Sequence, residues 1–260
     1  MIEQFVDGMA TYLPVINNTL GAGFLIFMRV AGMMRFAPLL NRSEVPNTIR
    51  MGFAFLLTVF LVSIIKPEMP PANASIIYYM AINYVFGAII GYIGYCIVAV
   101  VDAGGDMINT QMGMSSAMVL DPTSSTQVSI MGKFLGLLGL IIFVNMGGVY
   151  WMLNAFIRSF DICPLYAQAL PIEQVINKEY LIKITSNILY IGLQFASPVL
   201  LATLGQDIIL GIISKTAPQI NVFQLSFLFK PVMGAFLLAV LLPKLFGVIN
   251  DYFLSYANIF

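Results

Sequence analysis

The segment DAGGDMINTQMGMSSAMVLDPTSSTQ, residues 102–127, lies between hydrophobic stretches but is neither a clean hydrophobic span nor an ordinary charged loop. It opens with the small residues Ala103-Gly104-Gly105, which predict a flexible start. Its methionines crowd into twelve residues: Met107, Met112, Met114 and Met118. We interpret this segment as a moving or sealing part that the rest of the chain holds in place.

The composition of the whole chain is that of a membrane protein. Of its 260 residues, 60% are hydrophobic and 9% are charged, and the mean hydropathy is +0.92. Soluble domains are about half apolar and about a quarter charged. Twelve basic and twelve acidic residues cancel, so no net field attracts nucleic acid. We expect an all-α integral membrane protein that contacts lipid and finds its partners by shape and apolar contact.

The residue inventory argues against an enzyme and against a metal or cofactor site. The chain has no histidine, which removes histidine general bases, the triads that use them and HExxH metal sites. Residues 210–216, LGIISKT, lack the glycine before lysine of a P-loop, and Gly104-Gly105-Asp106 only weakly approximates an aspartyl protease motif. Cys96 and Cys163 form no CxxC pattern, so we interpret both as packing residues.

Hydrophobic stretches near the length needed to cross a membrane predict the helices. They cover residues 20–40, 51–65, 76–101, 134–157, 184–206 and 222–242. Asn145, Gly147 and Gly148 interrupt the fourth stretch and predict a bend. The last two stretches form a predicted helical hairpin.

Both arms of that predicted hairpin contain proline, which removes a backbone hydrogen bond and kinks a helix. Pro198 lies in the first arm, and Lys230-Pro231 lies in the second. A lysine in an apolar arm requires a partner, and Asp207 is the candidate if the arms pack with offset ends.

Two further features predict contacts between helices. Arg29 and Arg35 lie in the first hydrophobic stretch, where an arginine costs about 2.5 to 3.5 kcal/mol at the membrane centre. They either extend toward the headgroups or face protein or a wet cavity, and the sequence leaves both open. Gly87 and Gly91 form a small-xxx-small pair, which occurs by chance or lets two helix backbones approach closely.

The methionines of residues 102–127 allow two interpretations. On a helix, Met107, Gln111, Met114 and Met118 share one face, and Met112 adds a further soft side chain. Methionine re-packs against different surfaces, so the face is either a core filler or a seal that yields to a passing chain. Asp121-Pro122 reads as a helix N-cap followed by a first-turn proline that ends the segment.

Three stretches resemble, in order and spacing, the FliR family of flagellar biosynthetic proteins, whose relatives serve in type III secretion systems. They are FMRVAGMMRFAPLLNRSEVPNTIRMGFAFLLT (27–58), AGGDMINTQMGMSSAMVLDPTSSTQ (103–127) and DIILGIISKTAPQINVFQLSFLFKPVMGAFLL (207–238). The resemblance covers nearly the whole chain. One departure is that many members carry Asn-Gly-His where this chain has residues 145–148, NMGG, so a role of that histidine does not carry over.

The resemblance implies a non-enzymatic subunit of the flagellar export gate, in the bacterial inner membrane at the flagellar basal body. Its partners would be FliP and FliQ subunits, with FlhB and FlhA nearby, and its substrates unfolded flagellar proteins. Residues 1–183 would be a FliP-like part that includes the plug loop at about 102–127, and residues 184–260 a FliQ-like hairpin. The alternative is an autonomous small-solute transporter, which also uses broken helices and intramembrane charge.

The resemblance also implies roles for the residues singled out above. The methionine-rich face becomes the leading candidate for the seal of the closed pore, with Gly104 and Gly105 as its hinge and Asp121-Pro122 as its stop. Partner subunits or neighbouring helices would shield the remaining candidates: Arg29, Arg35, Gly87, Gly91, Asp207, Lys230 and Pro231.

Overall fold

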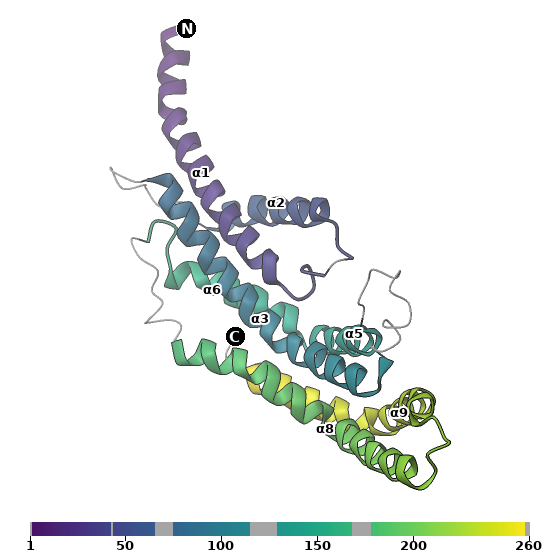
Figure 1. Ribbon diagram of the computed structural model, residues 1–260. Coiled ribbons are helices and arrows are strands. Elements are labelled where there is room, and N and C mark those ends of the chain that lie inside the picture. Colours follow the sequence, from purple (N-terminus) through teal and green to yellow (C-terminus); the bar gives the residue numbers. More distant parts are fainter. Residues whose placement is uncertain (1, 43, 66–74, 115–128, 168–177, 258–260) are drawn as a thin grey trace. The chain divides into compact units, whose positions relative to one another are not determined.

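A computed structural model of the chain describes residues 2–42, 44–65, 75–114, 129–167 and 178–257, and all regular structure in these ranges is helical (Figure 1). The helices are α1 (Ile2–Phe36), α2 (Asn47–Ile64), α3 (Ile76–Gln111), α5 (Ile130–Asn145), α6 (Gly148–Ile162), α8 (Lys178–Thr216) and α9 (Val222–Ala257).

Most of these helices are long and apolar enough to cross a membrane. Five pass by length and composition: α1 from Thr19 onward, α2, α3, α8 and α9. The pair α5 and α6 passes only together, as a broken span or a re-entrant loop. The break follows Asn145, and Gly147 there has a φ of 81°, which favours glycine. The prediction of an all-α integral membrane protein is confirmed, and so is the predicted interruption of the fourth hydrophobic stretch.

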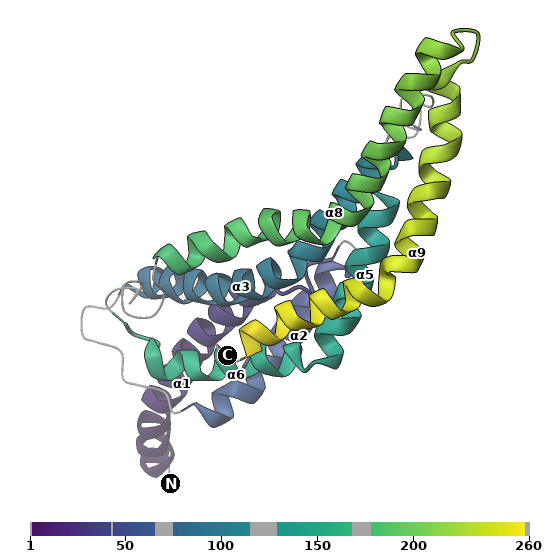
Figure 2. The ribbon, with the colours of Figure 1, turned by 90° about the horizontal axis from the view of Figure 1, so that it is seen from below.

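Several helix boundaries differ from the predicted ones. α3 continues to Gln111, beyond the predicted end at Val101, and therefore includes the start of the methionine-rich segment. The hairpin arms are also longer, since α8 reaches Thr216 and α9 reaches Ala257. Both helices continue through their prolines and change direction along their length (Figure 2). The bends agree with the kinks expected at these prolines, and the helices do not end there, because a helix can bend and lose one hydrogen bond without ending.

The chain divides into two compact units. The first unit comprises residues 1–95 and 150–181, and the second comprises residues 96–149 and 182–260. α3 contributes to both, because its sequence crosses the boundary at residues 95 and 96. The different division into a FliP-like part and a FliQ-like hairpin stays a prediction.

Glycines bring α1 and α3 together in the first unit. A Cβ atom added at Gly87 would collide with the backbone carbonyl of Arg29, and one at Gly91 with that of Met33. From the other side, Gly32 of α1 lies against the backbone of Tyr84. Close approach of this kind gains dispersion contacts where lipid supplies no hydrophobic drive between helices. Gly87 and Gly91 thus lie where the backbones of α1 and α3 approach each other closely.

The hairpin of α8 and α9 belongs to the second unit. The two helices lie side by side near residues 217–221, the turn that joins them, in both views (Figures 1 and 2). Only 22% of each of their apolar windows is buried, and 17% of α2, compared with 67% of α3. Large apolar helix faces thus remain uncovered by this chain, which suits contact with lipid or with other membrane proteins.

Candidate functional site: the frame of the methionine-rich loop

The structure describes the methionine-rich segment only at its start. Residues 102–114 lie in α3 and the turn that follows it, and the description resumes at Ser129, just before α5. Met118, Asp121 and Pro122 lie outside the described residues. The site considered below is therefore the frame that holds the loop, built within the second unit from α3, α5, α8 and α9.

Gly104 and Gly105 let α3 pack closely against two other helices of this frame. A Cβ atom at Gly105 would lie 2.8 Å from the Cα atom of Gly132 in α5, and one at Gly104 would lie 2.9 Å from the carbonyl oxygen of Gly192 in α8. Both glycines are buried in regular helix. The expected flexible start of the segment is therefore corrected: these glycines admit two neighbouring helices, and their hinge role during transport stays a prediction.

A hydrogen bond ties the end of α3 to the start of α5, and a second one caps α5. The Oδ1 atom of buried Asn109 accepts from the backbone N–H of Met131 at 3.3 Å. The Oγ atom of Ser129 accepts from the backbone N–H of Gly132 at 3.0 Å and caps α5. Gly113, with a φ of 73°, turns the chain after α3. The loop thus begins and ends at neighbouring points held by the frame.

The candidate sealing residues are divided between the surface and the interior. Met107 and Gln111 are half-buried on α3, and Met114 is half-buried just beyond it. Met112 is fully buried, and its side chain fills the space over Gly234 of α9, where an added Cβ would lie 2.9 Å from its Sδ atom. Met112 therefore packs the base of the loop against α9. The sequence alone did not distinguish this role from that of the neighbouring methionines.

Arg29 is the buried polar centre of the first unit. Its guanidinium donates to Oδ1 of Asn83 at 2.6 and 2.9 Å, to the carbonyl and the hydroxyl oxygen of Ser159 at 2.9 and 3.3 Å, and to the carbonyl oxygen of Cys163 at 2.7 Å. These bonds use all five donors of the group. Its Cζ atom also lies 4.3 Å from the ring centroid of Phe160.

This arrangement decides between the two interpretations of Arg29. The side chain has no exposed surface and faces protein, so it does not extend toward the headgroups. Its main acceptor, Asn83, is itself held by donating to the carbonyls of Tyr79 and Leu165. Asn83 and Ser159 were missed as functional residues. Each is a polar residue in a strongly apolar helix, and that contrast was the available signal.

The other charged candidates lie nearer the surface. Arg35 is exposed and donates to Oδ1 of Asn41 at 3.0 Å. Its exposure supports the interpretation that this arginine extends toward the headgroups. Lys230 Nζ lies 2.6 Å from Oδ1 of Asp207, so the two residues form an ion pair between the hairpin arms. Pro231 follows inside α9, so the pair lies at a position where the helix lacks one backbone hydrogen bond.

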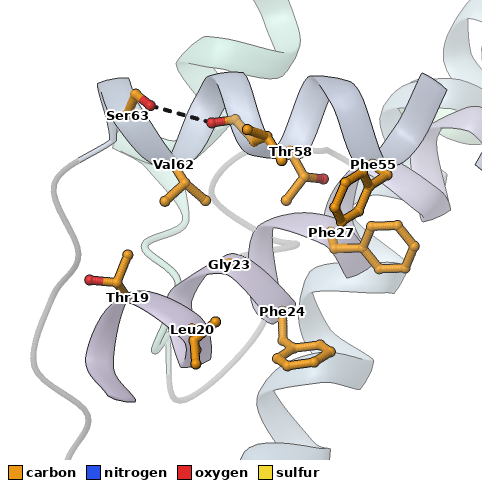
Figure 3. A pocket seen from close by; sticks show the side chains of 10 residues that line it. Thr19, Leu20, Gly23, Phe24, Phe27, Phe55, Thr58, Val62 and Ser63 are labelled. Carbon is orange, nitrogen blue, oxygen red and sulfur yellow. Dashed lines mark hydrogen bonds between the residues drawn. The ribbon is translucent and has the colours of Figure 1, made fainter. Parts of the chain in front are cut away.

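Two apolar cavities lie between pairs of the described helices. One is a groove of about 550 Å³ between α1 and α2, with Phe24, Phe27 and Phe55 gathered toward one end and Thr19 and Ser63 toward the other (Figure 3). The second, of about 510 Å³, lies between α8 and α9. Neither contains a cluster of titratable groups, so their linings suit acyl chains or apolar side chains rather than catalysis.

No group of three or more potential metal-ligating residues occurs in the described ranges. The two cysteines are buried and form no disulfide bond, one in each unit, which agrees with the interpretation of both as packing residues. The frame offers apolar surface and loop ends held by a hydrogen bond.

Comparisons with known proteins agree with this arrangement. The model of the family "Bacterial export proteins, family 1" matches residues 20–256. The flagellar biosynthetic protein FliR of Bacillus subtilis (strain 168) is 30% identical over 236 residues, which cover 89% of this chain and 90% of the relative. The FliR protein of Escherichia coli (strain K12) is 26% identical, with 85% and 84% covered.

A relative from another system has a similar extent. The surface presentation of antigens protein SpaR of Shigella flexneri is 24% identical over 243 residues, which cover 92% of this chain and 89% of the relative. Matches of this length leave little of the chain outside the shared architecture. The resemblance to the FliR family is thereby confirmed, and the chain belongs to the bacterial export proteins, family 1.

Proposed function

We propose that this chain is a membrane subunit of a type III protein export apparatus and that, with FliP and FliQ subunits, it forms the channel through which unfolded flagellar proteins pass. Its place is the inner membrane at the flagellar basal body, with FlhA and FlhB nearby. Family membership and relatives named for flagellar biosynthesis support the export role. The channel acts as a conduit and carries out no chemical conversion.

The observation that carries the channel role is the amount of apolar helix that the chain leaves uncovered. α2, α8 and α9 are mostly exposed along their apolar windows, although each is long enough to cross a membrane. α2 alone has exposed Phe53, Phe55 and Phe60. Aromatic side chains bury large areas and dominate interface energetics. Such faces are suited to packing against the helices of FliP and FliQ.

The seal of the channel is the methionine-rich loop. The hydrogen bond from the backbone N–H of Met131 to Asn109 holds together the two described ends between which the loop runs. Met107, Gln111 and Met114 keep partly exposed side chains at its base. Flexible methionine side chains close on one another when the pore is empty and re-pack around a passing polypeptide.

Loop replacement tests the seal. Residues 114–120 are exchanged for glycine and serine, which leaves Met112 and its packing in place, and the variant is produced together with the partner subunits. We expect increased leakage of ions or small molecules into the cells. A matched control exchanges residues 217–220 of the turn between α8 and α9. Permeability equal to that of the unaltered protein would show that the loop is not the seal.

Copurification tests the subunit role separately. We expect the chain to be recovered from detergent together with FliP and FliQ. Recovery as a monomer that takes up small solutes in liposomes would overturn the proposal in favour of an autonomous transporter.

A further inference from the structure

The turn between α1 and α2 carries arginines that the export role does not use. Arg35 lies in the last turn of α1, and Arg50 lies in the first turns of α2. Together with Asn47 and Tyr84 they line a cavity of about 230 Å³ within the first unit. No acidic residue is among those that line it in the described part of the chain.

The hydrogen bonds of these arginines leave donors available. Arg50 donates from Nη2 to the carbonyl oxygen of Arg42 at 2.7 Å, but its buried Nε atom has no hydrogen-bond partner among the described residues. Arg35 donates from Nη1 to Asn41, and no carboxylate neutralises either guanidinium within the described ranges. A buried donor without an acceptor costs about 1 to 3 kcal/mol, which an anion at this point would recover.

The start of α2 adds to the positive potential of the cavity. Asn47 is the first residue of the helix, no side chain caps this end, and the first turn has no acidic residue. The N-terminus of a helix carries the equivalent of about half a positive charge. Two guanidinium groups and an uncapped helix start therefore face one small cavity, and arginine forks match the oxygens of a phosphate.

The surroundings of the cavity identify the source of the phosphate. The uncharged stretch of α2 begins directly after Arg50, and its outer side chains are exposed, including Met51 and Phe55. Tyr84 at the cavity is also partly exposed, as expected for an aromatic ring at a membrane interface. Farther along the same helix pair lies the apolar groove of Figure 3, lined from residues 19–27 and 55–63.

We propose that this cavity binds the phosphate headgroup of an anionic phospholipid, whose acyl chains lie along the apolar surface of α1 and α2. The cationic end of the helix pair takes the head, and the exposed apolar side chains take the tails. Basic pockets between membrane helices hold anionic headgroups in this way. The site depends on membrane insertion and is independent of the proposed export role.

The test uses the purified full-length chain and native mass spectrometry with phosphatidylglycerol and phosphatidylcholine as probes. We expect bound phosphatidylglycerol on the unaltered chain, and a loss of about tenfold or more in its affinity in the double variant Arg35→Gln, Arg50→Gln. The matched control is Arg158→Gln, which removes an exposed arginine of α6 outside the cavity. Unreactive Cys96 and Cys163 verify that each variant is folded.

Four results would overturn the proposal. Equal affinity for the two lipids, or unchanged phosphatidylglycerol affinity in the double variant, would show that the cavity is not a headgroup site. Displacement of the lipid by equimolar inorganic phosphate would indicate a site for free anions. Loss of a partner subunit from the purified complex, with lipid binding unchanged, would instead assign the cavity to an acidic segment of that subunit.

Discussion

The two compact units both hold their helices together closely, but the first uses a buried arginine and the second a buried methionine. Both bring helices together at glycines, as at Gly87 in the first unit and Gly105 in the second. The first unit adds a buried arginine whose hydrogen bonds reach α3 and the region of α6. The second unit adds a buried methionine over Gly234. Directional bonds to a planar group fix one arrangement, whereas a methionine tolerates small shifts.

The unit that contains the adaptable methionine contact is also the unit that carries the methionine-rich loop. The methionine-rich loop is attached to the second unit, where the adaptable contact lies at its base, and the rigid polar centre lies in the unit without it. The units also contain one buried thiol each, Cys163 in the first and Cys96 in the second. Thiol labelling in single-cysteine variants therefore reports separately on the two units.

The largest expected effect is that of Arg29→Ala. The change leaves Oδ1 of Asn83 and the carbonyl of Cys163 without their donor and opens a cavity, so we expect a loss of about 3 to 5 kcal/mol in unfolding free energy. Cys163 should become reactive in a Cys96→Ser background, as measured by maleimide labelling. Arg158→Ala, at an exposed arginine, is the control.

Arg29→Lys sharpens this result, because lysine keeps the charge but cannot reproduce five donors in a plane. We expect it to remain clearly less stable than the unaltered chain. Stability equal to that of the unaltered chain would show that charge alone, and not the hydrogen-bond geometry, organises the first unit.

Met112→Ala should have the next largest effect. Truncation removes a fully buried side chain over Gly234, at a cost of about 2 to 4 kcal/mol, and should raise the labelling of Cys96 in a Cys163→Ser background. Met112→Leu conserves most of the volume and should cost less than about 1.5 kcal/mol. If Met107→Ala, at a half-buried position, were equally destabilising, Met112 would not be the specific anchor.

Gly105→Ala should cost about 1 to 3 kcal/mol, because the new Cβ atom would meet the backbone of Gly132, which cannot swing aside as a side chain can. The control is Gly211→Ala in α8, where no atom lies within 4 Å and alanine favours the helix. Thermal unfolding in detergent measures both. A destabilised Gly211→Ala and an unaffected Gly105→Ala would reject the close contact between α3 and α5.

The smallest effect is expected at the ion pair of the hairpin. Asp207 and Lys230 are both partly exposed, so a double-mutant cycle of Asp207→Asn and Lys230→Gln should give a coupling of about 0.2 to 1 kcal/mol that weakens with salt. A much larger, salt-independent coupling would place the pair in an environment without water.

Periodicity and composition were sufficient to predict the membrane class and the approximate helix positions. They did not predict where the helices end. The expected start of a loop at Gly104 and Gly105 was wrong because glycine signals flexibility in isolation, whereas here each admits another helix backbone. The Lys230 and Asp207 pair was predictable, since a lysine in an apolar arm requires a nearby carboxylate.

The sequence by itself determined the membrane class, the absence of histidine chemistry and the family resemblance, because these depend on composition and on local patterns. Only the tertiary structure decided that Arg29 is a buried centre and Arg35 an exposed one, and that Met112 belongs to the interior while Met107 and Gln111 remain at its edge. The reason is physical: burial and hydrogen bonding depend on which distant residues meet, and Asn83 and Ser159 lie 54 and 130 positions from Arg29 in the chain.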